Sequence, residues 1–256
     1  MVFLMETKQT SEENESLRNE MGFEKGESWP MDNSGGGRAG GLSVWWKEEI
    51  NATAMSGSLH HIDMKIVEGT DEVWRFTGVY GWPEGSDKEQ MWDLIRKLSN
   101  QWEGAWLCGG DLNQVLTAAE KAGGRAPVER DMQAFRDCLL DAQLSDLGYT
   151  GYDFTWENKR ATEGYIEERL DRFVATAAWQ HMFRQGRVLH LDKLRSDHRP
   201  IVCDTHGDDD IDPKWGWSFK FEPMWVKHEN CEKVVAEAWG MAGEADALCK
   251  LNVVRE

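Results

Sequence analysis

The segment Gly109-Gly110-Asp111-Leu112-Asn113 places a carboxylate and an amide two residues apart, directly after the apolar run 105–108. Residues two apart on a strand share one face, so Asp111 and Asn113 are expected side by side at a strand end. There Asp111 can take a proton while Asn113 holds a water or a phosphate oxygen, and the glycines let a ligand approach the backbone. The pattern indicates phosphoester hydrolysis, although Gly-Asp-x-Asn also occurs in ordinary strand-to-turn corners.

Two later segments add an imidazole and more carboxylates. In Ser196-Asp197-His198-Arg199-Pro200, Asp197 and His198 converge only if one of them lies in a loop, which the proline favours. In Arg169-Leu170-Asp171-Arg172, strand alternation puts Asp171 on a partly buried face, where it can orient an imidazole. The alternatives are a surface histidine and a surface cluster of ion pairs with the two arginines.

The elements that must position these side chains follow from apolar periodicity. Strands are expected over residues 2–5, 42–46, 61–67, 73–80, 105–108, 144–147, 154–156, 168–174 and 188–191. Those over 42–46, 61–67 and 73–80 are expected to be successive antiparallel strands. A helix capped by Asp87 or Ser86 is expected, with Met91, Trp92, Ile95 and Leu98 inward. Two more are expected, over 130–142, with Met132, Phe135, Leu139 and Leu140 inward, and over 177–183.

The chain length and charge limit the classes of protein. A chain of 256 residues can form one substantial core, so one main domain is expected over 1–206. The acidic run at 207–218 predicts a linker, and the apolar residues of 219–256 predict the start of another region. A net charge of -17 argues against broad attraction to a phosphate backbone, so nucleic-acid contact must be local or metal-assisted.

Other sequence features predict an intracellular protein, nuclear or cytoplasmic. No apolar stretch approaches the ~20 residues needed to span a bilayer, and the first residues lack the basic region of a secretory signal. The 5 cysteines are scattered without a Cys-x-x-Cys pair, which favours reduced structural thiols. His60 and His61 adjoin a strand start and could suggest a metal pair, but adjacent strand residues face opposite ways, so a structural role is expected. Neither a membrane partner nor a small organic cofactor is expected.

The motifs, taken in order, resemble the endonuclease/exonuclease/phosphatase superfamily over residues 2–204, and in particular the endonuclease domain of plant LINE-type non-LTR retrotransposons. The segments that carry the resemblance are Phe3-Leu4-Met5-Glu6-Thr7-Lys8, Gly78-Val79-Tyr80-Gly81-Trp82-Pro83, Gly110-Asp111-Leu112-Asn113, Phe154-Thr155-Trp156, Glu168-Arg169-Leu170-Asp171-Arg172 and Ser196-Asp197-His198-Arg199-Pro200. Residues 219–225 resemble the stretch that leads toward the reverse transcriptase in such elements.

The resemblance implies a four-layered α/β sandwich, in which two mixed, largely antiparallel sheets pack face to face between helices. It also implies a metal-dependent phosphodiesterase acting on DNA. Glu6 would be a ligand of Mg²⁺, with Mn²⁺ as the alternative, and Asp197 would assist the metal or the water. Asp111 would deprotonate the attacking water, which Asn113 positions.

The same resemblance implies roles for three further residues. His198 would hydrogen-bond the scissile phosphate, and Asp171 would hold its imidazole in the useful tautomer. Tyr80 would contact the phosphate or stabilise the leaving group. Water would attack in line and leave a 3′-hydroxyl and a 5′-phosphate.

One departure from the family pattern limits the expected activity. The family's first strand, which carries an Asn, and the helix after it have no counterpart in this sequence, which predicts an impaired nuclease. The alternatives are a phosphatase-like member of the superfamily that acts on a small phosphoester, and an inactive remnant that serves only as a binding module.

Overall fold

The computed structural model describes residues 1–29, 40–69, 72–83, 87–160, 164–193 and 195–207, together with 232, 233, 235, 236 and 239. The chain divides into two compact units, 1–207 and 208–256, and the five described residues of the second unit are helical. Most of the turn-rich loop around residues 32–41 and nearly all of the expected linker and tail lie outside the described residues. The domain boundaries stay a prediction.

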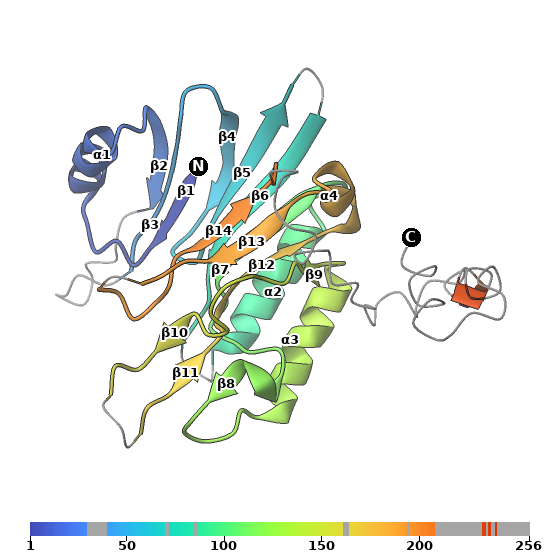
Figure 1. Ribbon diagram of the computed structural model, residues 1–256. Coiled ribbons are helices and arrows are strands. Elements are labelled where there is room, and N and C mark those ends of the chain that lie inside the picture. Colours follow the sequence, from blue (N-terminus) through green and yellow to red (C-terminus); the bar gives the residue numbers. More distant parts are fainter. Residues whose placement is uncertain are drawn as a thin grey trace. The chain divides into compact units, whose positions relative to one another are not determined.

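A six-stranded mixed sheet forms the centre of the first unit (Figure 1). In spatial order its strands are β4 (Asn51–Gly57), β5 (His61–Glu68), β6 (Glu72–Tyr80), β7 (Trp106–Asp111), β12 (Asp171–Ala175) and β9 (Ser145–Asp146). Neighbouring strands are antiparallel except β6 and β7, which run parallel. Helix α2 (Lys88–Ser99) makes the crossover that a parallel pair requires.

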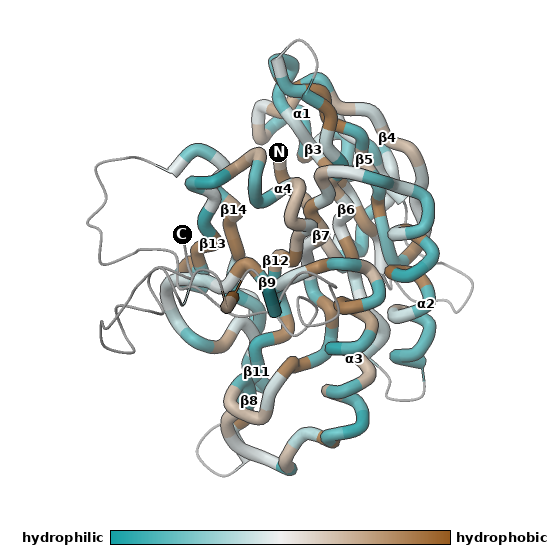
Figure 2. Tube along the Cα trace, turned by 90° about the vertical axis from the view of Figure 1, so that its right-hand side faces the viewer, coloured by the Kyte–Doolittle hydropathy of each residue, from teal (hydrophilic) through white to brown (hydrophobic). Residues whose placement is uncertain are grey.

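Two helices cover one face of this sheet. Helices α2 and α3 (Glu129–Asp141) lie side by side in Figure 1, and Figure 2 shows their outer turns as largely hydrophilic. Their buried residues pack on Val79, Trp106 and Val174 of the sheet. Cys138 is buried in α3, whereas Leu140, which was expected inward, is only partly buried. Position 138 lies one turn from 135 and thus on the buried face.

The other face of the sheet packs against a second layer. Strands β1 (Val2–Met5), β3 (Leu42–Trp46) and β2 (Lys25–Trp29) form an antiparallel sheet in the order β1-β3-β2. The expectation that residues 42–46 precede β5 in one antiparallel series is therefore wrong, because β3 pairs with β1 and β2. Strand β4, which we did not expect, takes the place beside β5.

A further pair of strands, β13 (Arg187–His190) and β14 (Ile201–Asp204), forms a sheet of its own. No strand of the described residues joins it to β1, so the second layer consists of two separate sheets where the sequence predicted one. The class is nevertheless α/β with mixed and antiparallel sheets, as expected. Two short helices complete the unit, α1 (Ser11–Glu20), which we did not expect, and α4 (Ala177–Met182).

The expected strand over 168–174 is broken. Residues Glu167–Glu168 form β11, which pairs with β10 (Trp156–Glu157) and β8 (Lys121–Ala122), and the short 3₁₀ helix η1 (Ala118–Glu120) precedes β8. Two residues later the chain enters the central sheet as β12. The strict alternation predicted across this segment is therefore wrong, because residues 169 and 170 belong to neither ladder.

No helix of the described residues is long and apolar enough to cross a membrane. The described cysteines, Cys108, Cys138 and Cys203, are free thiols, and the first two are buried.

Candidate active site

Three polar side chains line up across the ends of adjacent strands. Tyr80 ends β6, Asp111 ends β7 and Asp171 begins β12, and the register pairs Tyr80 with Asp111 and Asp111 with Asp171. Directly opposed residues of neighbouring strands point to the same face of a sheet. Asp111 and Asp171 are 3% and 2% exposed. The fold thus holds two carboxylates against each other under the second layer.

Asn113 reaches Asp111 through a turn. Its φ of 50° places it in the left-handed region beyond the end of β7. The backbone N–H of Asn113 donates to Asp111 Oδ1 at 2.8 Å, and Nδ2 donates to Asp111 Oδ2 at 3.1 Å. The predicted proximity is present, but strand alternation is the wrong reason for it. The segment from Asp111 to Asn113 is thus an Asx turn, in which the aspartate side chain accepts the N–H two residues later, and it also belongs to the candidate site.

The glycines before Asp111 make room for protein atoms. At Gly110 φ is 139°, and a Cβ there would lie 2.1 Å from the carbonyl oxygen of Val79. A Cβ at Gly109 would lie 2.2 Å from the ring of Phe173. Packing within the central sheet thus requires these glycines, and the expectation that they let a ligand approach the backbone stays a prediction.

His198 contacts both Asp111 and Asp171, which together form a carboxylate row across the strand ends. Its Nδ1 lies 2.9 Å from Asp171 Oδ2, and its Nε2 lies 3.9 Å from Asp111 Oδ2. The neighbouring arginines do not pair with Asp171, because Arg169 and Arg172 bind Glu120 and Asp146 in a buried network. Both alternatives, a surface histidine and an arginine-paired Asp171, are excluded by these contacts.

The short distances between Asp111, Asp171 and His198 shift the pKa values of Asp111 and His198. Burial, reinforced by the charge of Asp171, raises the pKa of Asp111 to about 7. Burial alone would lower the pKa of His198, but the hydrogen bond to Asp171 and the charges of Asp171 and Asp111 raise it to about 9. With Nδ1–H donated to Asp171, the Nε2 side of the imidazole faces Asp111.

Glu6 is connected to the carboxylate row through a hydrogen bond with Tyr80, whose register partner is Asp111. It directly follows β1 with a φ of 50°, and its Oε1 accepts the Tyr80 hydroxyl at 2.6 Å. Burial and this hydrogen bond raise the pKa of the Tyr80 phenol. Lys8 Nζ lies 3.9 Å from the other oxygen of Glu6. The Glu6 side chain is 49% exposed, which leaves room for a ligand.

Asp197 lies beside His198 but points elsewhere. Its side chain is 50% exposed and lies 3.8 Å from Lys159 Nζ. Burial would raise the pKa of Asp197, but the backbone amide and the charges of His198 and Lys159 lower it. A metal role for Asp197 stays a prediction.

One group of metal-capable side chains stands out among the described residues. Ligand atoms of Asp111, Asp171 and His198 all lie within 4.8 Å of one another. Two buried carboxylates that repel each other, with the pKa of Asp111 raised, fit a hard divalent cation, which would offset that repulsion. Glu6, tied to the same row by Tyr80, can supply another oxygen.

Several solved structures share this architecture. The endonuclease domain of TRAS1, a telomere-specific non-LTR retrotransposon, covers 70% of this chain and 79% of its own, with 18% sequence identity and a TM-score of 0.50. The human Nocturnin catalytic domain with bound sulfate anion covers 78% of both chains at 14% identity and a TM-score of 0.51. An endonuclease/exonuclease/phosphatase family protein from Leptotrichia buccalis C-1013-b covers 74% of this chain and 75% of its own, at 14% identity and a TM-score of 0.51.

The chain has the endonuclease/exonuclease/phosphatase fold. The resemblance carried by the six ordered segments is thereby confirmed at the level of the superfamily fold, whereas the plant LINE origin stays a prediction. No family model matches the sequence, and no curated protein matches it.

The sequence analysis missed Lys88, a lysine close to Asn113 in the candidate active site. Lys88 Nζ donates to Gln114 Oε1 at 2.6 Å, and Gln114 directly follows Asn113. Burial lowers the pKa of Lys88. The sequence did contain an indication of this contact. A lysine in the first turn of a helix is unfavourable because its charge opposes the helix dipole, which suggests that it has a polar partner.

The adjacent histidines are structural, as expected. His61 hydrogen-bonds Ser56 and Ser58, and His60 Nδ1 lies 2.8 Å from the carbonyl oxygen of Tyr80. The His60 ring stacks on Trp82 with 3.5 Å between the ring centroids. These contacts support the strand end that carries Tyr80.

Proposed function

We propose that this protein is a Mg²⁺-dependent phosphodiester hydrolase, and specifically a DNA-nicking endonuclease of retrotransposon origin, with Mn²⁺ as an alternative metal. The observation that carries the proposal is the Asp111–Asp171–His198 group at the strand ends, held by the 2.9 Å contact between Asp171 and His198. The fold shared with a retrotransposon endonuclease domain and the six ordered segments support the choice of substrate.

Asp111 is the proton acceptor of the reaction. Its pKa of about 7 suits a general base at neutral pH, and Asn113 beside it can orient the attacking water. Water then attacks phosphorus while the bond to the 3′ oxygen breaks. The proton of the water passes to Asp111, and the departing 3′ oxygen takes a proton from solvent, so the products are a 3′-hydroxyl and a 5′-phosphate.

His198 and Tyr80 act on the phosphate. With its pKa raised to about 9, the imidazole is protonated at neutral pH and donates Nε2–H to a phosphate oxygen, while Nδ1–H stays on Asp171, which fixes the orientation of the ring. Tyr80, with its pKa raised, keeps its proton and can donate it in a hydrogen bond to the phosphate or the leaving oxygen. Glu6 and Asp197 are the proposed metal ligands, and the metal would neutralise charge on the phosphate.

We expect the protein to act on DNA inside the cell, in the nucleus or the cytoplasm, and to work with a reverse transcriptase region in an intact element.

Nicking of supercoiled plasmid tests the proposal. We expect relaxed circles with MgCl₂ or MnCl₂ and none with a chelator. Asp111→Asn and His198→Ala should each lower the rate by at least about 100-fold, because each removes a group that acts on the reacting atoms. Asp137→Asn, the same change at an exposed position of α3, should nick like the wild type.

The other outcomes identify the alternatives. Hydrolysis of inositol phosphates without plasmid nicking would indicate a phosphatase-like member. Nicking that persists unchanged in Asp111→Asn would exclude this residue as the base. Absence of hydrolysis of both substrates by a folded wild type would favour a binding module.

A further inference from the structure

Thr155 holds the backbone that carries Asp171. Its Oγ1 accepts the N–H of Leu170 at 3.0 Å and the N–H of Asp171 at 2.9 Å. Leu170 lies between β11 and β12, where the chain changes sheets. Thr155 is 1% exposed, so water does not replace this acceptor readily.

The same residue contacts the segment that carries His198. The carbonyl oxygen of Thr155 accepts the N–H of Arg199 at 2.7 Å. The next residue, Trp156, forms an isolated antiparallel bridge with His198. Thr155 is thus bonded, through two different groups, to both sides of the Asp171–His198 contact.

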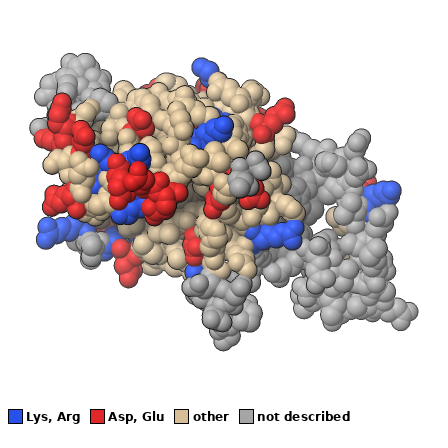
Figure 3. All heavy atoms as spheres, turned by 90° about the horizontal axis from the view of Figure 1, so that it is seen from above, with Lys and Arg blue, Asp and Glu red and all other residues tan. Residues whose placement is uncertain are grey.

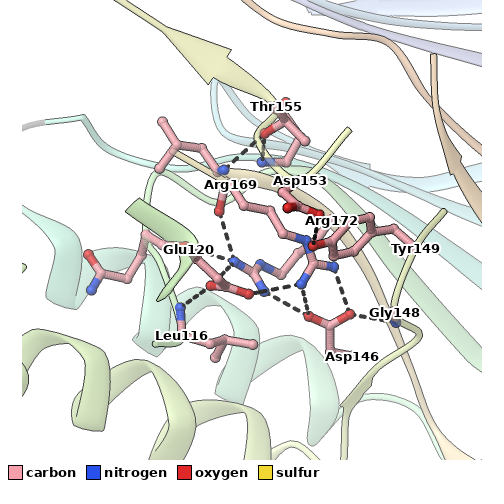
Figure 4. A network of polar contacts seen from close by, with 12 residues as sticks. Leu116, Glu120, Asp146, Gly148, Tyr149, Asp153, Thr155, Arg169 and Arg172 are labelled. Atoms are coloured by element: carbon pink, nitrogen blue, oxygen red, sulfur yellow. Dashed lines mark hydrogen bonds and ion pairs between the residues drawn. The ribbon is translucent and has the colours of Figure 1, made fainter. Parts of the chain in front are cut away.

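A rigid network surrounds this junction. Arg169 and Arg172, on either side of Leu170 and Asp171, are 3% and 0% exposed and are bound by the carboxylates of Glu120 and Asp146 (Figure 4). In Figure 4, Thr155 hydrogen-bonds the backbone beside this network. The arginines are held by Glu120 and Asp146, and Thr155 accepts the amides of the two residues between them.

We propose that Thr155 is a positioning residue for the His198 imidazole. Its hydroxyl sets the backbone of Asp171, and its carbonyl sets the backbone next to His198, so that the 2.9 Å contact between Asp171 and His198 depends on it. The kinetic part of this inference rests on the proposed nuclease function, whereas the geometric part does not.

Three variants separate positioning from general stability. Thr155→Val has a similar shape but removes the oxygen that accepts from both amides, whereas Thr155→Ser keeps that oxygen. Thr77→Val is the matched control, because the Thr77 hydroxyl is equally buried and accepts Trp106 Nε1–H, but in β6 away from this junction.

The first readout is independent of activity. In proton NMR at low temperature, the Nδ1–H of His198 should give a downfield resonance in the wild type, because it is donated to a carboxylate. We expect that resonance to be lost or strongly shifted in Thr155→Val and retained in Thr155→Ser and Thr77→Val. A folded Thr155→Val protein with an unchanged resonance overturns the proposal.

The second readout is the nicking rate. We expect kcat of Thr155→Val to fall about 10- to 100-fold with little change in KM, since misplacement of a reacting group by about 1 Å has such an effect. Thr155→Ser should recover most of the loss. If the wild type does not nick DNA, the proposed function fails, and the NMR result still decides the positioning role.

Hydrogen exchange of the wild type covers the case in which Thr155→Val does not fold. The amides of Leu170 and Asp171 should exchange as slowly as those of the adjoining β12. Exchange as fast as in an exposed loop would mean that the hydroxyl does not hold them, and the proposal would be wrong.

Discussion

At the strand ends two carboxylates face each other, but only one of them is hydrogen bonded to the imidazole. Asp171 lies 2.9 Å from His198 Nδ1, whereas Asp111 lies 3.9 Å from Nε2. Asp111 instead accepts two N–H groups of Asn113 and has its pKa raised to about 7 by burial and by Asp171. These different surroundings support the proposed division of roles, in which Asp171 orients the histidine and Asp111 accepts a proton.

This division predicts the titration of His198. Its imidazole should titrate near pH 9 in the metal-free wild type. In Asp171→Asn the pKa should fall to or below the ordinary value of 6.5, because burial opposes the charged form once its main partner is neutral. NMR titration of the imidazole signals measures both values. A pKa near 6.5 in the wild type would contradict the inferred charge coupling.

The same shift predicts how stability depends on pH. The pKa of His198 is raised on folding, so its stabilisation is fully present below pH 6.5 and is lost as the pH rises through about 9. Between pH 7.5 and 10 the wild type should lose about 1–2 kcal/mol of unfolding free energy from this source, less than the full shift because the ring is 31% exposed. Urea unfolding should show a smaller loss over this range in Asp171→Asn.

At the scale of single residues, the sequence predicted which side chains pair better than it predicted their backbone conformations. The Asp171–His198 pair followed from the residue types and the resemblance, and it is present in the structure. The turn at Asn113 could not be predicted from alternation, because its φ of 50° takes it out of the strand. Thr155 was named only within a motif, since nothing in the sequence shows which amides a buried hydroxyl will meet.

At the scale of elements, the junction between β11 and β12 depends on a buried group of four charges. Arg169 and Arg172 each bind Asp146 and Glu120 at 2.7–2.9 Å between the closest atoms. Burial would raise the pKa of Asp146, but the two guanidinium groups hold it well below its ordinary value. Such a network is costly to break, because removal of one partner leaves an uncompensated buried charge.

Arg172→Met should therefore destabilise the fold. We expect the free energy of unfolding to fall by about 3–5 kcal/mol, because Glu120 and Asp146 would share one remaining arginine. Chemical denaturation measures this change. Arg130→Met is the control, since the Arg130 side chain is 88% exposed, and it should change stability by less than about 0.5 kcal/mol. Similar effects at both positions would show that the network does not stabilise the junction.

Elements with an apolar face were predicted well, and polar ones were missed. Helix α2 and strand β6 carry periodic apolar residues, and the structure contains both. Helix α1 buries only Asn14, so periodicity could not reveal it. Its start was nevertheless readable, because Thr10 and Glu13 form a capping box in which each side chain accepts the other's backbone N–H. The break between β11 and β12 depends on long-range pairing, which local alternation does not contain.

At the scale of the whole chain, acidic residues outnumber basic ones by 46 to 29. The face shown in Figure 3 carries both signs, and acidic side chains gather on its left side, where Figure 1 places α1 with its four glutamates. A phosphate backbone would meet general repulsion at low ionic strength. DNA binding by such a chain should therefore depend on cations bound at the candidate active site more than on the electrostatic field of the whole molecule.

Divalent cations should therefore stabilise the protein beyond simple screening. Any salt lowers the self-repulsion of a chain of net charge -17, so MgCl₂ must be compared with NaCl at equal ionic strength. We expect millimolar MgCl₂ or MnCl₂ to raise Tm further than NaCl does, because a cation bound to the folded state adds its binding free energy to stability. The excess should shrink in Glu6→Gln and persist in Glu27→Gln, where the exposed residue in β2 lies outside the carboxylate row. An equal rise with both salts would show that these carboxylates act only through general charge, and the metal-dependent mechanism would lose its basis in this chain.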